Sequence, residues 1–434
     1  MLIEFKLVNF RSFRDEASLS MEATGLKEYR NSLTLTNNKE ILPSVAIFGK
    51  NGGGKSNIIR GFWLGAQFIK NAQKTQHEKA LIPVNPFSLN DYSNAEPTGF
   101  EYDYISDGIR YVYGFKATKE TIVEEYLHHY PKKVKAVIFD RQYQVFRFPE
   151  GPEKKKKEMI MQAVAANQLF FSIACTMNYQ PCIQAMKWFR EELFFSQDYP
   201  DIPQQLLQNA DNANMLSAIT EYAKEADLGI LDMNFEFKES DLTDQVALPE
   251  DMPEELKTAL RSFMNALAEA PSASESKLTI SAINATSYHD GIKKNGERER
   301  FPIKLSDESD GTKRLMALAP AIERTLSQGG VLVVDELEKD MHPILMEFII
   351  SKFQSKNTNL ANAQLIFTTH NTELLNMELL RKDQLYFVDK DRESGASELY
   401  CIKSLKTHTS ENIQKSYLKG KYGATPNLEI EEVS

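Results

Sequence analysis

One segment of eight residues has the composition of a phosphate-binding loop. Residues 49–56 read Gly-Lys-Asn-Gly-Gly-Gly-Lys-Ser and fit the pattern G-x-x-x-x-G-K-[ST]. Glycines at these positions let successive main-chain N–H groups turn inward around a β-phosphate, and a helix that begins at the lysine adds its dipole. Lys55 supplies a point charge, and Ser56 supplies a hydroxyl ligand for Mg²⁺. The segment therefore predicts binding of a nucleoside triphosphate with Mg²⁺.

Two adjacent carboxylates follow a short apolar run later in the chain. Residues 331–334 (Val-Leu-Val-Val) have the composition of a strand buried on both faces, and Asp335 and Glu336 come directly after it. Phosphoryl transfer needs neutralised phosphate oxygens and a positioned nucleophile. We therefore expect Asp335 to hold the magnesium shell and Glu336 to orient and polarise the attacking water.

A histidine ends the next apolar run. His370 follows residues 364–369 and lies 35 residues after Asp335, with a helix-like segment at 343–353 between them. This arrangement predicts two parallel strands whose carboxyl ends meet at one edge of a sheet. His370 is then expected to reach the γ-phosphate.

A fourth polar segment precedes an apolar helix. Ser309, Asp310, Gly311 and Thr312 come just before the helical pattern of residues 315–322. Either Ser309 or Asp310 is expected to cap this helix, and the free N–H groups of a helix N-terminus favour an anion.

The elements around these residues have clear periodicities. Residues 3–7 and 17–21 alternate as half-buried strands, and residues 45–48 form a strand that leads through the glycine-rich loop into a helix after Ser56. Hairpins are expected over 100–115, turning at Asp107-Gly108, and over 134–148. Residues from about 180 to 300 are expected to form a helical insertion with helices over 183–195, 215–226 and 254–268. Strand character is expected to resume at 278–280, and residues 385–402 are expected to form a hairpin.

The composition excludes several classes of protein. The chain has 434 residues, 42% of them hydrophobic, and few glycines and prolines, which excludes collagen-like and wholly disordered proteins. The chain has 51 Lys and Arg residues and 61 Asp and Glu residues, so its net charge is 51 − 61 = −10. The electric field of the whole protein therefore repels nucleic acids and acidic membranes. The uncharged stretch 159–186 contains too many amides to span a membrane. Three cysteines fit neither a disulfide framework nor a zinc site, so we expect a cytoplasmic protein.

These motifs, in this order, resemble the ABC class of ATPases, in the branch that includes RecF, SMC heads and the OLD-type nucleases. The opening residues 8–13 (Val-Asn-Phe-Arg-Ser-Phe) are similar to the first strand and turn of that branch. The resemblance implies an α/β P-loop NTPase of the ABC-ATPase head type, with a mixed sheet, an antiparallel β lobe and a helical lobe. It also implies ATP and Mg²⁺ as cofactors, with Ser56 and Asp335 at the metal.

The same resemblance assigns roles to residues. Glu336, His370 and Lys55 are expected to be catalytic. The expected nucleotide contacts are Gly49, Lys50, Asn51, Gly52, Gly53, Gly54, Lys55, Ser56, Asn57, Arg11, Ser309 and Gly311. One head is expected to span 1–434, with a Walker A and antiparallel lobe at 1–175, the helical insertion at about 180–300, the signature, Walker B and switch region at 301–390, and a C-terminal hairpin and tail at 385–434.

Further details are similar to the AbiLi/RloA-type ATPases of abortive infection and phage defence. These are the early turn 9–13, Asn178 ahead of Trp188-Phe189, and the ending at 417–427. That subfamily implies a separate effector protein. The signature departs from Leu-Ser-Gly-Gly-Gln, keeping Ser309 and Gly311 and losing the glutamine. The Q-loop residue is left open among Gln142, Gln168 and Gln180.

The class resemblance implies a head-to-tail homodimer or higher oligomer, in which Ser309 of one copy caps nucleotide on the other. Two alternatives stay open. Asp389 and Asp391 at a strand end would suit a metal-dependent nuclease. Lys132, Lys133, Lys135 and residues 154–157 would suit a RecF-like clamp on DNA, although the net charge does not indicate a nucleic-acid partner.

Overall fold

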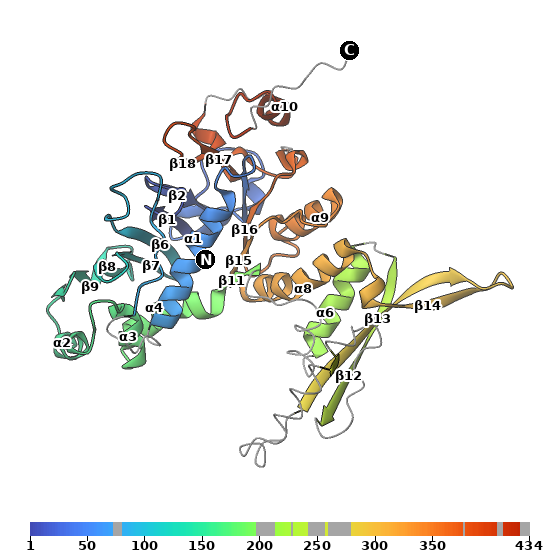
Figure 1. Ribbon diagram of the computed structural model, residues 1–434, viewed down its shortest axis with the longest axis horizontal. Helices are drawn as coiled ribbons and strands as arrows, with labels where there is room; N and C mark the ends of the chain where they lie inside the picture. Colours follow the sequence, from blue (N-terminus) through green and yellow to red (C-terminus); the bar gives the residue numbers. More distant parts are fainter. Residues whose placement is uncertain are drawn as a thin grey trace. The chain divides into compact units, whose positions relative to one another are not determined.

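The computed structural model describes residues 1–72, 80–196, 213–226, 229–241, 257–258, 279–375, 378–405 and 411–425. The chain forms two compact units (Figure 1). The first consists of Met1–Asp198 and Ala321–Ser434, and the second of Tyr199–Pro320.

A six-stranded sheet carries the phosphate loop in the first unit. Its order is β11-β15-β16-β5-β17-β18, and every neighbouring pair is parallel except β17 with β18. The four inner strands are almost entirely buried, which explains their continuous apolar runs. The bounds are β11 Leu193–Phe195, β15 Val331–Val334, β16 Gln364–Thr368, β5 Ser44–Phe48, β17 Leu385–Lys390 and β18 Ser397–Cys401.

A seven-stranded antiparallel sheet forms the second layer of this unit. Its order is β10-β9-β8-β7-β6-β1-β2, and the β6–β7 hairpin turns at Asp107-Gly108 as predicted. Residues 122–129, which the periodicity had not identified, supply β8. The bounds are β1 Leu2–Val8, β2 Ala17–Ser20, β6 Thr98–Ser106, β7 Ile109–Ala117, β8 Ile122–His129, β9 Ala136–Gln142 and β10 Val145–Arg147.

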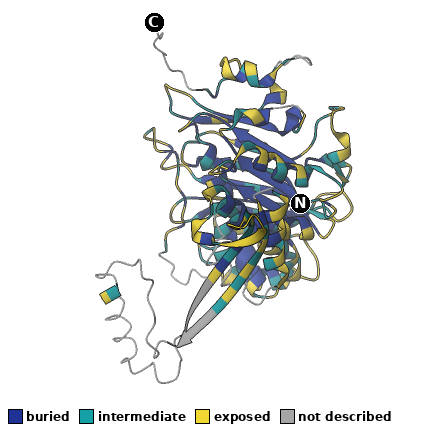
Figure 2. Ribbon diagram, turned by 90° about the vertical axis from the view of Figure 1, so that its right-hand side faces the viewer, coloured by how far each residue is buried: buried dark blue, intermediate teal, exposed yellow. Residues whose placement is uncertain are grey.

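Helix α1 (Lys55–Asn71) packs against both sheets, because it contacts β1 and β6 of one and β16 of the other. Phe62 in its centre stacks on Phe5 of β1 at 4.4 Å between ring centroids and meets Phe195 of β11 edge-on at 5.5 Å. These rings belong to one buried hydrophobic cluster with residues from both sheets. Figure 2 colours the ribbon of buried residues dark blue. The start of α1, and with it the phosphate loop, is thereby fixed to the core.

Shorter elements complete the first unit. The segment 183–195 was predicted to be one helix, but it runs as α4, then a π-helix, then β11, because its last three apolar residues pair with β15. The remaining bounds are α2 Lys154–Gln162, α3 Phe170–Thr176, α4 Gln180–Lys187, π-helix η3 Trp188–Glu192, α9 Pro343–Gln354, α10 Ile413–Leu418, β3 Thr34–Thr36 and β4 Lys39–Ile41. Single 3₁₀ turns cover Arg30–Ser32, Thr372–Leu375, Lys382–Gln384 and Ile402–Ser404.

The second unit differs from the predicted helical insertion. It contains α6 (Ala213–Glu225), which was predicted, and a three-stranded antiparallel sheet of β12 (Ile230–Asp241), β13 (Thr279–Ile292) and β14 (Arg298–Lys304). Of this sheet, only strand character at the start of β13 was predicted. The alternation of apolar and polar residues over 231–237 (Leu-Asp-Met-Asn-Phe-Glu-Phe) explains β12. The predicted helix 254–268 lies outside the described residues except at 257–258.

Helix α8 (Asp310–Gln328) begins in the second unit, after a 3₁₀ turn at Leu305–Asp307, and ends in the first. Within the described residues, no helix has the length and apolar character needed to cross a bilayer.

Candidate functional site: a phosphate loop beside an acidic strand end

The phosphate loop turns between β5 and α1. Gly54, the last residue before α1, has φ +119°, and a Cβ there would lie 2.6 Å from Ser397 Oγ and 2.9 Å from Ser12 Oγ. Only glycine fits this backbone and this space. The loop therefore leaves room at the helix N-terminus for main-chain N–H groups to meet an anion.

Lys55 lies at the first position of α1 and is buried, with 5% of its surface exposed. Its ammonium donates to Gly49 O at 2.7 Å and Lys50 O at 3.3 Å, and lies 3.2 Å from His370 Nδ1. Burial lowers the pKa of Lys55 to about 8, although nearby carboxylates, Glu338 first among them, act in the opposite direction. The ammonium is thus held at the loop by carbonyl groups that a phosphate could replace.

Ser56, the next residue of α1, contacts the acidic strand end. Ser56 Oγ donates to Asp335 Oδ1 at 3.2 Å. The parallel pairing of β15 with β16 and of β16 with β5 produces this meeting, because it brings the carboxyl ends of these strands to one edge. A hydroxyl and a carboxylate oxygen are the donors that Mg²⁺ prefers, so the residues present fit this ion.

Glu336 and His370 complete the cluster. Glu336 is exposed and has φ +51°, a conformation that non-glycine residues seldom adopt. Burial, and then the charge of Lys55, lowers the pKa of His370, so its imidazole is neutral near pH 7. Of the residues predicted from sequence, the structure brings together Lys55, Ser56, Asp335 and His370 through the contacts above.

Other predicted contacts have different surroundings. Asn57 donates its side-chain N–H to Ser12 Oγ at 2.8 Å, which ties α1 to the turn that contains Arg11. Arg11 has φ +49°, and its main-chain N–H donates to Asn85 O. Burial, followed by the charge of Arg60, lowers the pKa of the Arg11 guanidinium. Asn51 and Gly52 are exposed on the loop.

Ser309 and Gly311 belong to the second unit. Ser309 Oγ accepts from Thr312 N at 3.1 Å and lies 2.8 Å from Thr312 Oγ1. Of the two predicted caps, Ser309 is therefore the N-cap of α8.

Lys50 forms an ion pair that sequence reasoning missed. Its ammonium lies 2.9 Å from Asp389 Oδ1 at the end of β17. Burial alone would raise the pKa of Asp389, but hydrogen bonds from Lys50 and from the main-chain N–H of Ala424 hold it below its ordinary value. Asp391 instead caps the β17–β18 turn by accepting from Ser394 N and Oγ.

Both carboxylates of the nuclease alternative are thus engaged in local structure. In the part of the chain that the structure describes, no three His, Cys, Asp or Glu side chains are grouped as ligands for a metal ion.

Three hydroxyls also escaped sequence reasoning. Thr368 at the end of β16 contacts Asp335, Ser12 accepts from Asn57, and Ser397 Oγ donates to Gly53 O at 2.7 Å. Two positions gave a signal: Thr368 lies two residues before His370, and Ser12 lies in the early turn 9–13.

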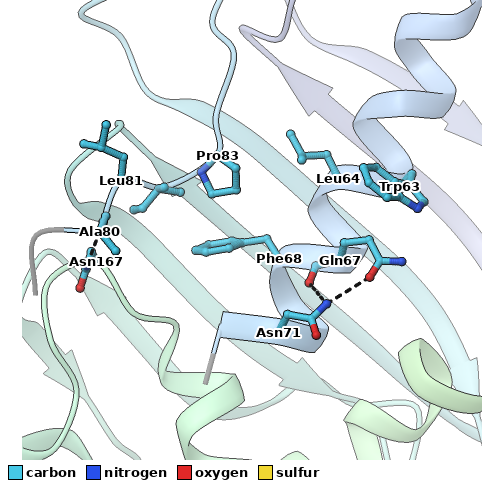
Figure 3. A pocket seen from close by; sticks show the side chains of 10 residues that line it. Trp63, Leu64, Gln67, Phe68, Asn71, Ala80, Leu81, Pro83 and Asn167 are labelled. Carbon is cyan, nitrogen blue, oxygen red and sulfur yellow. Dashed lines mark hydrogen bonds between the residues drawn. The ribbon is translucent and has the colours of Figure 1, made fainter. Parts of the chain in front are cut away.

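A separate pocket of about 280 Å³ lies beside the C-terminal half of α1 (Figure 3). No predicted site residue lines it. Inside it, Asn71 donates to Gln67 O and Oε1 at 3.0 and 3.1 Å. The lining residues are Trp63, Leu64, Gln67, Phe68, Asn71, Ala80, Leu81, Ile82, Pro83 and Asn167.

Comparisons with solved structures find only weak similarity. The SMC head domain from Thermotoga maritima has 14% identity and a TM-score of 0.37, covering 92% of this chain and 98% of that chain. A structure of the recombination mediator protein RecF with ATP has 11% identity and a TM-score of 0.38, covering 92% of this chain and 97% of that chain. No curated protein matches the chain significantly.

A family model provides the assignment. The model described as "AAA domain, putative AbiEii toxin, Type IV TA system" matches residues 44–376, a range that begins at β5 and includes the phosphate loop, the acidic strand end and His370. This match confirms the predicted resemblance to ABC-class ATPases related to Abi-type proteins. The chain therefore belongs to this family of AAA domains related to the AbiEii toxin of type IV toxin–antitoxin systems.

Proposed function

We propose that this chain is an Mg²⁺-dependent ATPase whose turnover switches the conformation of a homodimer, and that the dimer controls a separate effector in phage defence. The observation that carries the ATPase proposal is the meeting of Lys55, Ser56, Asp335 and His370 at one sheet edge. Ser56 Oγ lies 3.2 Å from Asp335 Oδ1, and Lys55 Nζ lies 3.2 Å from His370 Nδ1. Membership of the AAA family supports the same reading.

Each residue has a part in hydrolysis that follows from its surroundings. Lys55 exchanges its carbonyl acceptors at Gly49 and Lys50 for the oxygens of the β- and γ-phosphates. Ser56 and Asp335 would hold Mg²⁺, and when bound this ion neutralises charge on the phosphate oxygens. The exposed carboxylate of Glu336 orients the attacking water and accepts its proton.

His370 serves as the γ-phosphate sensor. Lys55 donates to Nδ1 of its neutral ring, so the ring carries its own proton on Nε2. That N–H is the donor available to a phosphate oxygen.

The test is single-turnover and steady-state hydrolysis of ATP by wild type and Glu336→Gln. We expect Glu336→Gln to retain Mg²⁺-dependent ATP binding and to lose about 10²-fold or more in turnover, as general-base removal does. Glu347→Gln removes an exposed carboxylate on α9 and serves as the matched control. Hydrolysis by Glu336→Gln at the wild-type rate would refute the assignment of the base.

The dimer proposal rests on the class resemblance and on the capped start of α8. Ser309 caps that helix, and in a head-to-tail arrangement its N-terminus offers N–H groups to the γ-phosphate held by the other copy. We expect Glu336→Gln with ATP and Mg²⁺ to form a dimer in light scattering, and Glu336→Gln combined with Ser309→Arg to stay monomeric while still binding ATP. A dimer in the double variant would refute this geometry.

The effector proposal rests on the subfamily resemblance. We expect a second protein encoded in the same operon to copurify with Glu336→Gln in ATP, and to do so less with Lys55→Ala. Equal copurification with both variants would contradict nucleotide control of the partner.

A further inference from the structure

Thr368 joins the two carboxylate residues of the acidic strand end. It is the last residue of β16 and has no exposed surface. Its hydroxyl donates to Asp335 Oδ1 at 2.6 Å and accepts from Glu336 N at 2.7 Å. A single hydroxyl thus fixes the side chain of the proposed metal ligand and the main chain of the proposed base, using its one donor hydrogen for the first.

The turn that follows Asp335 needs such support. Glu336 has φ +51°, a conformation that is unfavourable for residues other than glycine. The same turn is fastened twice more to the end of β16, because Leu337 N donates to Thr368 O at 3.1 Å and His370 N donates to Glu338 Oε1. An unfavourable backbone conformation persists only where its surroundings over-determine it, and here the end of β16 does so.

We propose that Thr368 is a positioning residue for ATP hydrolysis, an inference that rests on the function proposed above. Its hydroxyl sets the orientation of Asp335 toward Mg²⁺ and, through Glu336 N, the direction in which the Glu336 carboxylate projects. Because Thr368 is two residues from His370, the strand that carries the γ-phosphate sensor also aligns the metal ligand and the base. Loss of the hydroxyl leaves Asp335 with one fewer donor and the turn with one fewer restraint.

The experiment compares three variants at two neighbouring positions. Thr368→Val keeps the shape and removes the hydroxyl, while Thr368→Ser keeps the hydroxyl. Thr369→Val is the matched control and makes the same change at the adjacent residue. Thr369 is also fully buried, and its hydroxyl accepts from Asn371 N at 3.0 Å. Binding of a non-hydrolysable fluorescent ATP analogue is titrated with Mg²⁺, and turnover of ATP is measured in parallel.

We expect Thr368→Val to need about 10- to 100-fold more Mg²⁺ for analogue binding and to lose a similar factor in kcat, which is the usual cost of removing a partner of a metal ligand. Thr368→Ser should restore both values, and Thr369→Val should keep the wild-type Mg²⁺ dependence. A Thr368→Val protein with wild-type Mg²⁺ dependence, or a Thr369→Val protein that shows the same loss, would overturn the inference.

Two further comparisons keep the outcome decisive. If Thr368→Val fails to fold by circular dichroism, Thr368→Ser is compared with Thr368→Ala, since these two differ only in the hydroxyl, and equal Mg²⁺ dependence of the pair overturns the inference. If wild type itself shows no Mg²⁺-dependent binding of the analogue, the proposed function fails. If wild type binds and the Thr368 variants match it, only the role of Thr368 fails.

Discussion

The Lys55 ammonium is buried and, within the described part of the chain, contacts no carboxylate directly. Its ammonium is nearly enclosed, yet its partners are two main-chain carbonyls and the neutral ring of His370. Burial without a contacting carboxylate lowers its pKa to about 8 from the ordinary value of 10.5. The ammonium is therefore less favourable in the folded, nucleotide-free protein than in the unfolded chain.

This imbalance predicts a pH effect on stability. Between about pH 8 and pH 10.5 the unfolded chain still binds a proton at Lys55 that the folded protein has released, so Lys55 makes the free energy of unfolding rise with pH in that window. We expect urea unfolding near pH 8 and near pH 10 to show a larger gain for wild type than for Lys55→Met. Equal changes in the two proteins would contradict the assignment.

At the scale of elements, the phosphate loop is supported from both ends of the chain. Ser397 of β18 donates its hydroxyl to Gly53 O and its main-chain N–H to Ser12 O, while Asn57 of α1 donates to the Ser12 hydroxyl. The N-terminal turn, through Ser12, and the C-terminal hairpin, through Ser397, therefore both lie against the loop at Gly53 and Gly54. The loop is shaped by its supports as well as by its own glycines.

A pair of glycine substitutions separates these contributions. Gly52 has φ +74° and nothing within 4 Å of an added Cβ, so Gly52→Ala should cost only the backbone term of about 1–2 kcal/mol. Gly54→Ala adds a clash with Ser397 and Ser12, which should bring a further loss of about 1–3 kcal/mol. Urea unfolding measures the free energy of unfolding of each variant. Equal losses for Gly52→Ala and Gly54→Ala would show that Ser397 and Ser12 do not restrict the side chain at position 54.

The antiparallel lobe depends on a buried ion pair. Glu125 of β8 accepts from Phe170 N and Phe171 N at 2.8 and 2.9 Å, at the start of α3, and lies 3.2 Å from Arg141 Nη1. Both charged side chains are fully buried. The pair therefore joins α3 to the middle of the seven-stranded sheet.

Removing one member of this pair should be costly. We expect Glu125→Ala to lower the free energy of unfolding by about 3–5 kcal/mol, because the buried Arg141 keeps its carbonyl acceptors but loses its carboxylate partner. Glu124 is the neighbouring residue on β8, and Glu124→Ala, which breaks its partly exposed pair with Lys116 of β7, should cost about 0–1 kcal/mol. Chemical denaturation of the two variants checks the contrast, and similar losses would argue against a structural role for the buried pair.

The elements that sequence reasoning predicted best are those whose signals are local. The strand, glycine-rich loop and helix at 44–71 follow from one apolar run and one motif, and the pairing of β15 with β16 follows from two apolar runs around a helix. The roles of the hydroxyls of Thr368, Ser12 and Ser397 could not be read from their local sequence, because each hydroxyl gains its importance from a partner that is distant in sequence. The ion pair of Asp389 with Lys50 depends on β5 and β17 lying side by side, which the sequence does not show. Asp389 was therefore considered as a metal ligand.

At the scale of the whole molecule, the first unit is assembled from two separated stretches of chain. Residues 1–198 supply the phosphate loop, and residues 321–434 supply Asp335, Glu336 and His370. The intervening second unit contains Ser309 and the beginning of α8, and α8 continues into the first unit. One helix thus links the proposed dimer contact to the nucleotide-binding unit along the chain.

The proposed dimer predicts a concentration effect. ATP at about 100 times its Kd should stabilise the protein by about 2.7 kcal/mol if it binds only the folded state. For Glu336→Gln with ATP and Mg²⁺, Tm should also rise with protein concentration, because closure recruits a second copy. Adding Ser309→Arg should abolish the dependence on protein concentration and leave the ATP effect. Tm values of the Glu336→Gln protein that do not change over a hundredfold range of concentration would count against assembly.

The position of β5 has a consequence for biosynthesis. Both strands that pair with β5 come from the last quarter of the chain, β16 at Gln364–Thr368 and β17 at Leu385–Lys390. On the ribosome, more than three hundred residues are translated after β5 before the first strand that pairs with it is made. A nascent chain released before residue 364 would carry the complete glycine-rich motif but neither strand that pairs with β5, so we expect such a fragment to bind no nucleotide.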